Sequence, residues 1–276
     1  MTVLALGILS WRAPATLAAT LESFAAGGLL DLFDERRVHF QEIGAEDRAV
    51  AARYGLSAGG TERNTGIEGG VRALVEGTRG DLILLLENDC PLVEDGAVAR
   101  DALSRAVADM ARHDVPVFRM RSRRRPGEQF TRTDKYQRFF PVRDPRETEV
   151  AIHPPSPVLR ALRRMARPLK ARSFRGDAAY LERDPAAAQP GAIRRSDHGN
   201  HITDSRFINW SNQSVLARPG FVREVLLPGV AAHPSRRTIA GAQDIERAAN
   251  RRWWRDLRVP VGISDPGLFT HRRLDR

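Results

Sequence analysis

The sequence predicts an α/β protein in which a mostly parallel central sheet is flanked by helices. In the first 112 residues, short apolar runs alternate with amphipathic stretches, which is the pattern of parallel strands joined by crossover helices. One run, 82–86, contains only Leu and Ile and ends abruptly in Glu87, Asn88 and Asp89, as expected of a strand buried on both faces. Beyond residue 112 the pattern weakens, so we expect an irregular second half.

The elements of the first half can be assigned in order along the chain. Pro14 favours a helix start and Gly27 a helix end, because Pro suits the first helical turn and Gly the residue after the last. Apolar residues at helical spacing follow Gly66. The expected elements are a strand over 3–9, a helix from Pro14 to Gly27, a strand over 38–43, a helix over 45–54, a helix over 67–77, the strand over 82–86 and a helix over 95–112.

The second half offers weaker signals. Residues 119–200 are rich in Arg, Pro, Gly and Asp, which predicts long loops and one basic helix over 157–171. Ordered segments are expected to return toward the C-terminus, at 207–217 and 221–227, in a helix over 242–255 and in a closing segment at 259–263.

Composition limits the class of protein. The chain has 276 residues, of which 42% are hydrophobic, enough for a substantial core. Cys90 is the only cysteine, so no intrachain disulfide can form. No stretch approaches the roughly 18 apolar residues of a membrane helix, and the N-terminal residues lack the pattern of a signal peptide. We therefore expect a cytoplasmic protein.

The formal net charge is +10 and is carried almost wholly by arginine, since Lys135 and Lys170 are the only lysines. One interpretation is an anionic partner such as phosphate, phospholipid or nucleic acid. The other is a GC-rich genome that uses arginine wherever a basic residue is tolerated. The runs at 119–125 and 160–172 leave contact with a membrane surface or a polyanion open.

Carboxylates follow the buried strand at 82–86. Ligands in open α/β sheets bind at the carboxyl ends of the strands, and carboxylates there commonly hold a hard divalent cation against nucleotide phosphates. Glu87 and Asp89 therefore predict an enzyme that uses a nucleotide. A plain strand end, in which Asp89 organises a turn before Pro91, stays open as the alternative.

Three motifs resemble the donor-side motifs of GT-A glycosyltransferases, most closely the family-two group. They are Ile-Leu-Ser-Trp-Arg at 8–12, Arg-Asn-Thr-Gly at 63–66 and Leu-Leu-Leu-Glu-Asn-Asp at 84–89. The resemblance implies a Rossmann-like GT-A fold formed by one domain over 1–276. Its nucleotide-sugar-binding half would be 1–112 and its acceptor-binding half, with long loops, 113–276.

The resemblance also implies roles for individual residues. Asp89 would bind Mn²⁺ or Mg²⁺ together with His271, whose imidazole makes Mn²⁺ the more plausible ion, and Arg272 or Arg273 could neutralise charge. Glu87 stands where the family has its first Asp, so it either binds the metal or contacts the ribose. An N-cap role for Asn64 and a surface position for His271 stay open. The implied donor-binding residues are Ser10, Arg12, Glu42, Arg63, Asn64, Glu87 and Asn88.

The acceptor side carries fewer candidates. Asp244 matches the position of the family's catalytic base and Glu246 is the reserve, although acidic residues also favour the first turn of any helix. Trp210 and Asn212 would suit a sugar-binding wall, although Trp210 could equally be part of the core.

The sequence thus predicts a metal-dependent glycosyltransferase that moves a sugar from a nucleotide-sugar donor to a hydroxyl of a glycan or glycolipid, with inversion. The resemblance implies bacterial polysaccharide or glycolipid synthesis as its setting, with possible peripheral contact at the inner face of the membrane. A nucleotidyltransferase is an alternative, but a Gly-rich, Lys-containing phosphate loop is missing. A nucleic-acid or polyanion-binding protein is another, without a recognisable nucleic-acid motif. A non-catalytic GT-A domain is the third.

Overall fold

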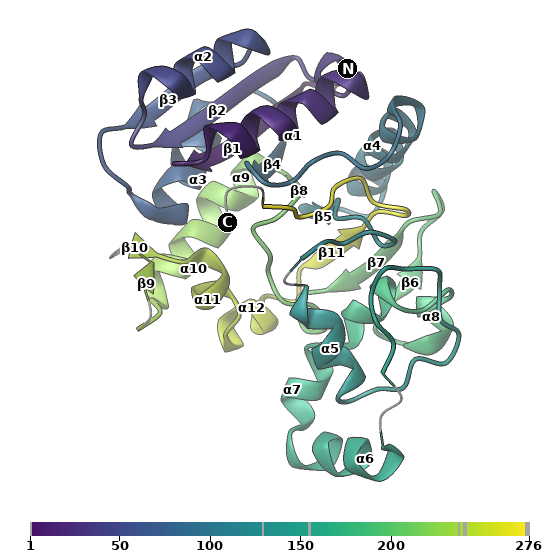
Figure 1. Cartoon of the computed structure of the whole chain (residues 1–276). Coiled ribbons are helices and arrows are strands. Elements are labelled where there is room, and N and C mark those ends of the chain that lie inside the picture. Colours follow the sequence, from purple (N-terminus) through teal and green to yellow (C-terminus); the bar gives the residue numbers. More distant parts are fainter. Residues whose placement is uncertain (1, 129, 154–155, 237, 240–241, 274–276) are drawn as a thin grey trace.

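The computed structural model describes residues 2–128, 130–153, 156–236, 238–239 and 242–273. Its centre is a nine-stranded sheet in the order β3-β2-β1-β4-β8-β5-β11-β7-β6, flanked by helices (Figure 1). A separate two-stranded sheet pairs β9 (Thr238–Ile239) with β10 (Ala242–Gln243). The strands of the large sheet are β1 (Leu4–Trp11), β2 (Glu35–Gln41), β3 (Ser57–Thr61), β4 (Leu82–Glu87), β5 (Val117–Arg119), β6 (Arg194–Arg195), β7 (His201–Asp204), β8 (Val215–Ala217) and β11 (Pro260–Ile263).

The first half follows the predicted alternation of strands and helices. Strand β1 pairs in parallel with both β2 and β4, and the run 82–86 is buried along its whole length. Pro14 stands at the start of the first helix, as predicted. The helices of this half are α1 (Pro14–Ala26), α2 (Ala45–Arg53), α3 (Gly66–Gly77) and α4 (Gly96–Arg112), with a short 3₁₀ turn at Leu30–Leu32.

The sequence did not reveal β3, which pairs in parallel with β2 at the edge of the sheet. Its sequence Ser-Ala-Gly-Gly-Thr contains no large apolar side chain, and most of its residues are exposed. Because strand signals in a sequence depend on apolar and β-branched side chains, a strand that is held only by backbone pairing to its neighbour leaves no such signal.

The second half extends the sheet in mixed directions. Strand β8 is antiparallel to both β4 and β5, β11 is parallel to β5, and β7 is antiparallel to both β11 and β6. Only β8 and β7 therefore run against the other seven strands. The prediction of a mostly parallel sheet is confirmed, although its second half is not built from simple crossovers.

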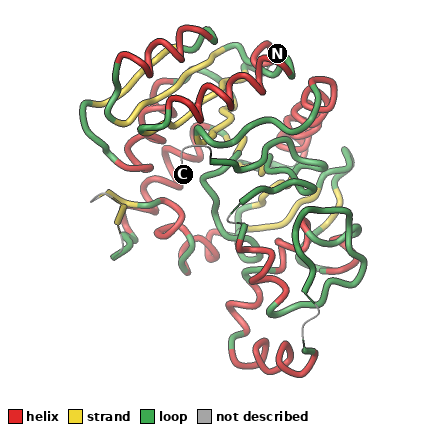
Figure 2. The backbone as a smooth tube through the Cα atoms, viewed as in Figure 1, coloured by secondary structure: helices red, strands yellow, loops and turns green. Residues whose placement is uncertain are grey.

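Several boundaries in the second half differ from the prediction. The expected helix over 157–171 is two helices, because Pro168 cannot continue the first one. The expected helix over 242–255 is split at Asn250, and 221–227 is helical. Figure 2 shows in green the long loops that join these elements. The helices are α5 (Thr131–Gln137), α6 (Pro157–Ala166), α7 (Pro168–Arg172), α8 (Pro185–Ala188), α9 (Pro219–Phe221), α10 (Leu227–Ala232), α11 (Ile245–Ala249) and α12 (Arg252–Leu257), with a 3₁₀ segment at Arg175–Tyr180 and a π-helical one at Val222–Leu226.

Two apolar clusters cover the two faces of the sheet. One contains side chains of α1 and α4, such as Phe24 and Leu103. The other contains side chains of α3, α11 and α12, such as Leu74 and Trp254. The sheet is thus buried on both faces, as the apolar run of β4 predicts. Among the described residues, no helix is both long enough and apolar enough to cross a membrane.

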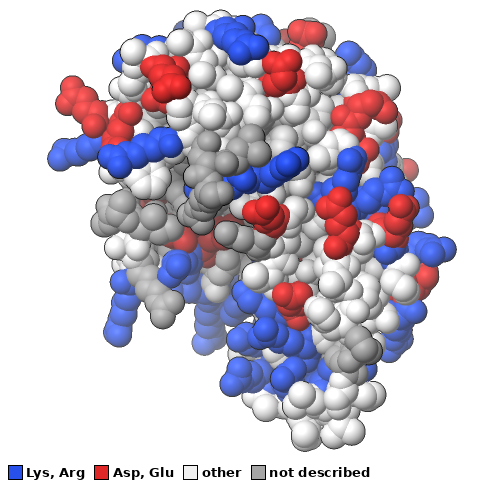
Figure 3. All heavy atoms as spheres, viewed as in Figure 1, with Lys and Arg blue, Asp and Glu red and all other residues white. Residues whose placement is uncertain are grey.

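Part of the positive charge lies inside the protein. Arg119, Arg121 and Arg123 alternate along β5 and its extension and are 4%, 6% and 1% exposed. Carbonyl oxygens accept hydrogen bonds from all three, for example Pro126 O from Arg121 at 2.6 Å. These three residues therefore cannot form the surface contact that the run at 119–125 left open. Figure 3 shows other Lys and Arg side chains gathered on the lower part of the molecule.

The ion pair between Arg123 and Asp265 gives a stability prediction. Burial alone would raise the pKa of Asp265, but the hydrogen bond with His201 and the charge of Arg123 outweigh burial and hold this pKa well below its usual range. Asp265→Asn should lower the free energy of unfolding by about 3 kcal/mol at neutral pH, because it leaves a buried guanidinium uncompensated. Asp101→Asn, which removes the exposed partner of Arg105, is the matched control and should cost less than about 1 kcal/mol.

The same pair predicts a dependence on pH. A carboxyl whose pKa is lower in the folded state stabilises the fold above its unfolded-state pKa, about 4 for Asp, and loses this contribution as the pH falls toward the lowered value. Urea denaturation at neutral and acidic pH should therefore show the difference between wild type and Asp265→Asn shrinking in acid. A difference that stays constant across this range would contradict the assigned ion pair.

Candidate active site

Three potential metal ligands converge at the carboxyl end of β4. One ligand atom each from Glu87, Asp89 and His271 lie within 4.8 Å of one another. His271 Nε2 is 3.0 Å from Asp89 Oδ2, and Arg273 Nε is 3.6 Å from the same oxygen. The structure therefore brings together the two predicted metal ligands, and it adds Glu87 and one of the two candidate arginines.

His271 reaches Asp89 because the C-terminal segment lies between two other segments. On one side, the N–H of Arg272 donates to Asp89 O at 2.8 Å. On the other, the N–H of Glu128 donates to His271 O at 3.0 Å. Gly127 has φ +77°, and a Cβ there would lie 2.3 Å from His271 O. Only glycine fits at this close approach.

The imidazole of His271 is oriented by both of its nitrogens. Nδ1 lies 3.1 Å from the carbonyl oxygen of Glu128, which fixes Nδ1 as the protonated nitrogen of the neutral ring. Nε2 is then the nitrogen that faces Asp89. Burial lowers the pKa of His271, but the hydrogen bond and charge of Asp89 outweigh burial and raise it. A backbone carbonyl that orients the second nitrogen is the usual support of a metal-binding histidine.

Glu87 stands in an environment that disfavours its charge. Burial, followed by the charges of Asp89 and Glu246, raises the pKa of Glu87 to about 7. Its one described hydrogen bond is a long one, 3.5 Å from Gln213 Nε2. The negative charges of Glu87 and Asp89 repel each other, and a bound cation would stabilise both carboxylates in their charged form. Two carboxylates and an imidazole form a donor set that fits Mn²⁺, and the oxygens alone fit Mg²⁺.

A cleft of about 260 Å³ opens beside these ligands. Ser10 lies in its wall and is 1% exposed, and its Oγ has no hydrogen-bond partner among the described residues. Buried hydroxyls in folded proteins usually have a polar partner, which a water or a polar group bound in the cleft could supply to Ser10. The cleft is lined by Leu9, Ser10, Trp11, Gln41, Asn64, Gly66, Ile67, Glu87, Asn88, Asp89 and Arg273.

Gln41 is a cleft residue that the sequence analysis missed. Its Oε1 accepts from the N–H of Thr65 at 2.7 Å, and its Nε2 donates to Gly66 O at 2.7 Å. Asn64 Oδ1 accepts from the N–H of Gly66, also at 2.7 Å. Gln41 and Asn64 thus hold the turn before α3, but Asn64 is not the N-cap, because that position belongs to Thr65. The sequence could have indicated Gln41, because it is a polar residue at the end of a strand that runs parallel to β1.

Three predicted donor-binding residues do not line the cleft. Arg12 and Glu42 form an ion pair of 2.5 Å, and Glu42 also accepts from Trp11 Nε1 at 3.3 Å. Arg12 and Glu42 have φ values of +47° and +62°, which are unusual outside glycine and occur at functional sites. Both residues lie at the ends of parallel strands next to Trp11, which does line the cleft. Arg63 is exposed.

Asn88 has a mainly structural set of contacts. Its carbonyl accepts from Thr20 Oγ1 at 2.7 Å, and its Nδ2 lies 3.5 Å from Ala13 O. Asn88 is 8% exposed, although it contributes to the cleft wall. These contacts fix the end of β4 against α1, which holds Glu87 and Asp89 on either side of it.

A loop at 209–214 connects the ligand cluster to the predicted catalytic residues. Trp210 is 4% exposed and packs edge-on against Trp254, so it belongs to the core and offers no open face for a sugar. Its Nε1 donates to Asn212 Oδ1 at 2.8 Å, and the N–H of Asn212 donates to Glu246 Oε1 at 3.0 Å. Trp210 and Asn212 therefore position Glu246.

Asp244 and Glu246 have different surroundings. Asp244 caps α11: its Oδ1 accepts from the N–H of Glu246 at 3.0 Å, and its Oδ2 lies 3.2 Å from Arg247 Nε. Burial and the charge of Glu246 raise the pKa of Asp244. Glu246 is close enough to raise the pKa of Glu87, and among the described residues only its Oε1 is hydrogen-bonded.

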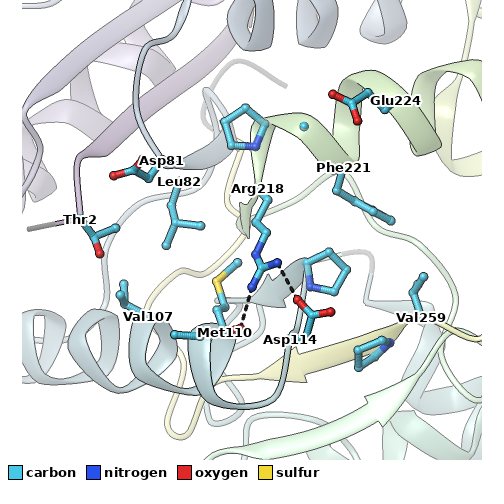
Figure 4. A pocket seen from close by; sticks show the side chains of 15 residues that line it. Thr2, Asp81, Leu82, Val107, Met110, Asp114, Arg218, Phe221, Glu224 and Val259 are labelled. Carbon is cyan, nitrogen blue, oxygen red and sulfur yellow. Dashed lines mark hydrogen bonds and ion pairs between the residues drawn. The ribbon is translucent and has the colours of Figure 1, made fainter.

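A larger cavity of about 610 Å³ lies at the opposite end of β4, near Leu82 and Asp81 (Figure 4). Its arginine, Arg218, already donates to Asp114 at 2.6 Å and to Met110 O at 2.9 Å. Ligands of α/β sheets bind at the carboxyl ends of parallel strands, whereas this cavity is at the amino ends. The smaller cleft is therefore the better candidate site.

Comparison with known proteins gives likeness of structure only. No protein-family model and no curated protein matches the sequence. A 1–349 form of S. aureus TarS in complex with UDP-GlcNAc matches 99% of this chain and 60% of its own, with 10% identity and a TM-score of 0.49. The mannosyltransferase PcManGT from Pyrobaculum calidifontis, in complex with GDP-Man and Mn²⁺, matches 51% of this chain and 42% of its own, with 13% identity and a TM-score of 0.38.

A third solved structure is glucosyl-3-phosphoglycerate synthase from Mycobacterium tuberculosis in complex with Mn²⁺, UDP and glucosyl-3-phosphoglycerate. It matches 43% of this chain and 43% of its own, with 15% identity and a TM-score of 0.34. The chain thus spans at most 60% of the length of these three structures.

Proposed function

We propose that this protein is a metal-dependent glycosyltransferase that transfers a sugar from a nucleoside-diphosphate donor to a hydroxyl group, with inversion. The observation that carries the proposal is the convergence of Glu87, Asp89 and His271 at the carboxyl end of β4, beside a cleft with an unpartnered buried hydroxyl at Ser10. Each of the three motifs that resemble donor-side motifs contributes a residue to the lining of this cleft, for example Ser10, Asn64 and Asp89.

The ligand cluster would hold Mn²⁺ or Mg²⁺. Asp89 and His271 are the proposed ligands, and Glu87 becomes a third when it is deprotonated. When a divalent cation is bound, it supplies Lewis-acid stabilisation of the negative charge that develops on the diphosphate leaving oxygen. Arg273, 3.6 Å from Asp89, would contribute further positive charge. Ser10, Gln41 and Asn64 would contact the nucleoside.

We assign the role of catalytic base to Glu246 and a positioning role to Asp244. Both oxygens of Asp244 are engaged, by the N–H of Glu246 and by Arg247. Glu246 is held by the N–H of Asn212 through one oxygen, which leaves the other to accept a proton from the attacking hydroxyl. A glycan or glycolipid acceptor would approach from the side of the 209–214 loop.

A thermal-shift titration tests the proposal. Wild-type protein is heated with UDP or GDP, with Mn²⁺ or with EDTA. A ligand that binds only the folded state stabilises it and so raises the melting temperature. At a ligand concentration of 100 times Kd the stabilisation is about 2.7 kcal/mol. We expect the shift only when Mn²⁺ is present, followed by release of sugar from the matching sugar nucleotide. A shift of equal size in EDTA would contradict the proposal.

His271→Ala should weaken Mn²⁺-dependent nucleotide binding by more than about tenfold, since losing even an indirect support of a metal ligand costs that much. The substitution removes the imidazole nitrogen beside Asp89 that is proposed to bind the metal, while the backbone contacts of the C-terminal segment remain. His153→Ala, at an exposed histidine, is the matched control and should bind as wild type does. Unchanged Mn²⁺ dependence in His271→Ala would remove this residue from the ligand set.

A further inference from the structure

Helices α6 and α7 form an amphipathic surface with few contacts to the rest of the protein. No residue of α6 is buried, and Ala171 is the only buried residue of α7. In Figure 1 both helices lie at the end of the molecule opposite α1 and α2. An isolated helix as short as α6 is marginal in water, so a surface that covers it would stabilise it.

The exposed apolar side chains of the protein are concentrated here. Of seven large apolar side chains exposed in the described chain, five lie between residues 158 and 169, so their exposure is a local feature. Val158, Leu162 and Met165 are spaced by four and three residues and therefore share one face of α6. They are 69%, 56% and 78% exposed.

Basic side chains border this apolar face. A cavity of about 480 Å³ lies between α5 and the α6–α7 pair, and no acidic side chain of the described residues lines it. None of its basic residues forms an ion pair with a described residue. No Asp or Glu occurs between Glu149 and Asp177 in the sequence. Its lining consists of Lys135, Arg138, Phe139, Leu162, Arg163, Ala166, Arg167 and Lys170.

We propose that α6 and α7 dock this protein on a membrane that contains anionic phospholipid. The apolar face of α6 would enter the acyl boundary, and the cavity would receive a lipid phosphate. Leu162 contributes to both surfaces, so the two features adjoin. Figure 3 shows basic side chains above an uncharged tip at the same end of the molecule. This inference goes beyond the proposed function and does not depend on it.

Charge and apolarity together select this partner over two others. A second copy of the chain would bring two sets of five unpaired cations together, which costs energy. A nucleic acid would be attracted by the cations, but it offers nothing to cover five apolar side chains. An anionic bilayer satisfies both features, because each basic residue near its surface contributes attraction and the apolar side chains leave water.

Co-sedimentation with vesicles tests the proposal. Wild-type protein should bind vesicles of phosphatidylcholine mixed with phosphatidylglycerol, and much less those of phosphatidylcholine alone. A variant in which Arg163, Arg167 and Lys170 are changed to Gln should bind the mixed vesicles roughly 100-fold more weakly. A variant with Val158, Leu162 and Met165 changed to Ser should also lose binding. Since all six residues are exposed, both variants should unfold at the wild-type temperature.

The matched control changes Arg48, Arg79 and Arg100 to Gln, which removes the same charge from exposed positions outside α6 and α7. This variant should bind as wild type does. If the control loses as much vesicle binding as the first variant, the attraction depends only on the net charge of the protein, and the proposal is overturned. Absence of vesicle binding would also overturn it, whether accompanied by a dimer that the apolar variant dissociates or by DNA binding that only the basic variant loses.

A fluorescent label distinguishes contact at α6 from contact elsewhere. Cys90 is fully buried, so a cysteine placed at Met165 can be labelled selectively with a polarity-sensitive dye. Mixed vesicles should shift its emission to the blue, whereas the same dye at Arg48→Cys should not respond. A response at residue 48 without one at residue 165 would place the membrane contact on another face and refute the proposal.

Discussion

Replacing Asp89 by alanine is expected to abolish the Mn²⁺-dependent part of nucleoside-diphosphate binding. Asp89 is 3% exposed and lies 3.0 Å from His271 Nε2 and 3.6 Å from Arg273 Nε. Its removal takes one of two carboxylates from the cluster and leaves Glu87, whose burial still disfavours the charged form when Asp89 is absent. A hard cation depends on anionic oxygen ligands, so its affinity should collapse.

Titration of UDP or GDP by calorimetry, with Mn²⁺ and with EDTA, measures this effect. In Asp89→Ala, both titrations should give the weak affinity that wild type has in EDTA. Asp89→Asn keeps the shape of the side chain and should behave in the same way, which separates charge from packing. Asp31→Ala, at an exposed carboxylate, is the matched control. The assigned metal site is wrong if wild type binds the nucleotide equally well with Mn²⁺ and with EDTA, and if both Asp89 variants bind it as tightly as wild type does.

The second large effect is expected at Glu246. Glu246→Gln keeps the size of the side chain and its acceptor for the N–H of Asn212 but removes the basic group. Turnover should fall by roughly 10² to 10⁴, while the affinity for the donor diphosphate stays at the wild-type level. A loss in turnover alone marks an interaction made only in the transition state.

Asp244→Asn is the paired variant and should cost much less. Asparagine caps a helix about as well as aspartate, so α11 and Glu246 should stay in place. Initial-rate measurements on both variants, at saturating donor and acceptor, give the ranking. If Asp244→Asn causes the larger loss, the base is the residue that the motif resemblance placed first. Near-normal turnover in both variants would exclude both residues and favour a retaining mechanism.

Much of the first half could be predicted because its signals are local. The apolar run of β4 and the Pro and Gly residues that bound α1 act within a few neighbouring residues, and they give the same elements in the structure. Asp89 was identifiable for the same reason, since it directly follows a buried strand. Strand β3 could not be predicted, because backbone pairing with β2 holds it in place and its side chains show no apolar pattern.

The assembly of the site depends on contacts between distant segments. Asp89 was recognisable in the sequence, and the resemblance named His271, but the hydrogen bonds at Arg272 and Glu128 place the imidazole beside the carboxylate. Asp244 and Glu246 are acidic residues two positions apart at one helix start in the sequence. Asp244 pairs with Arg247 within the same helix turn. Only the fold brings Glu246 to the N–H of Asn212 and close enough to Glu87 to raise the pKa of Glu87.

Burial divides the arginines in the same way. The arginines at 119, 121 and 123 look no different in sequence from those at 160, 163 and 164, yet the first three lie inside the protein. Their charges are compensated there by carbonyl oxygens and by Asp265, most of which belong to distant segments, such as Asn209 and Ala179. Periodicity and motif describe what a segment can do by itself. Which side chains become buried, paired or close to a ligand depends on the segments packed against them, and these are brought together only when the chain folds.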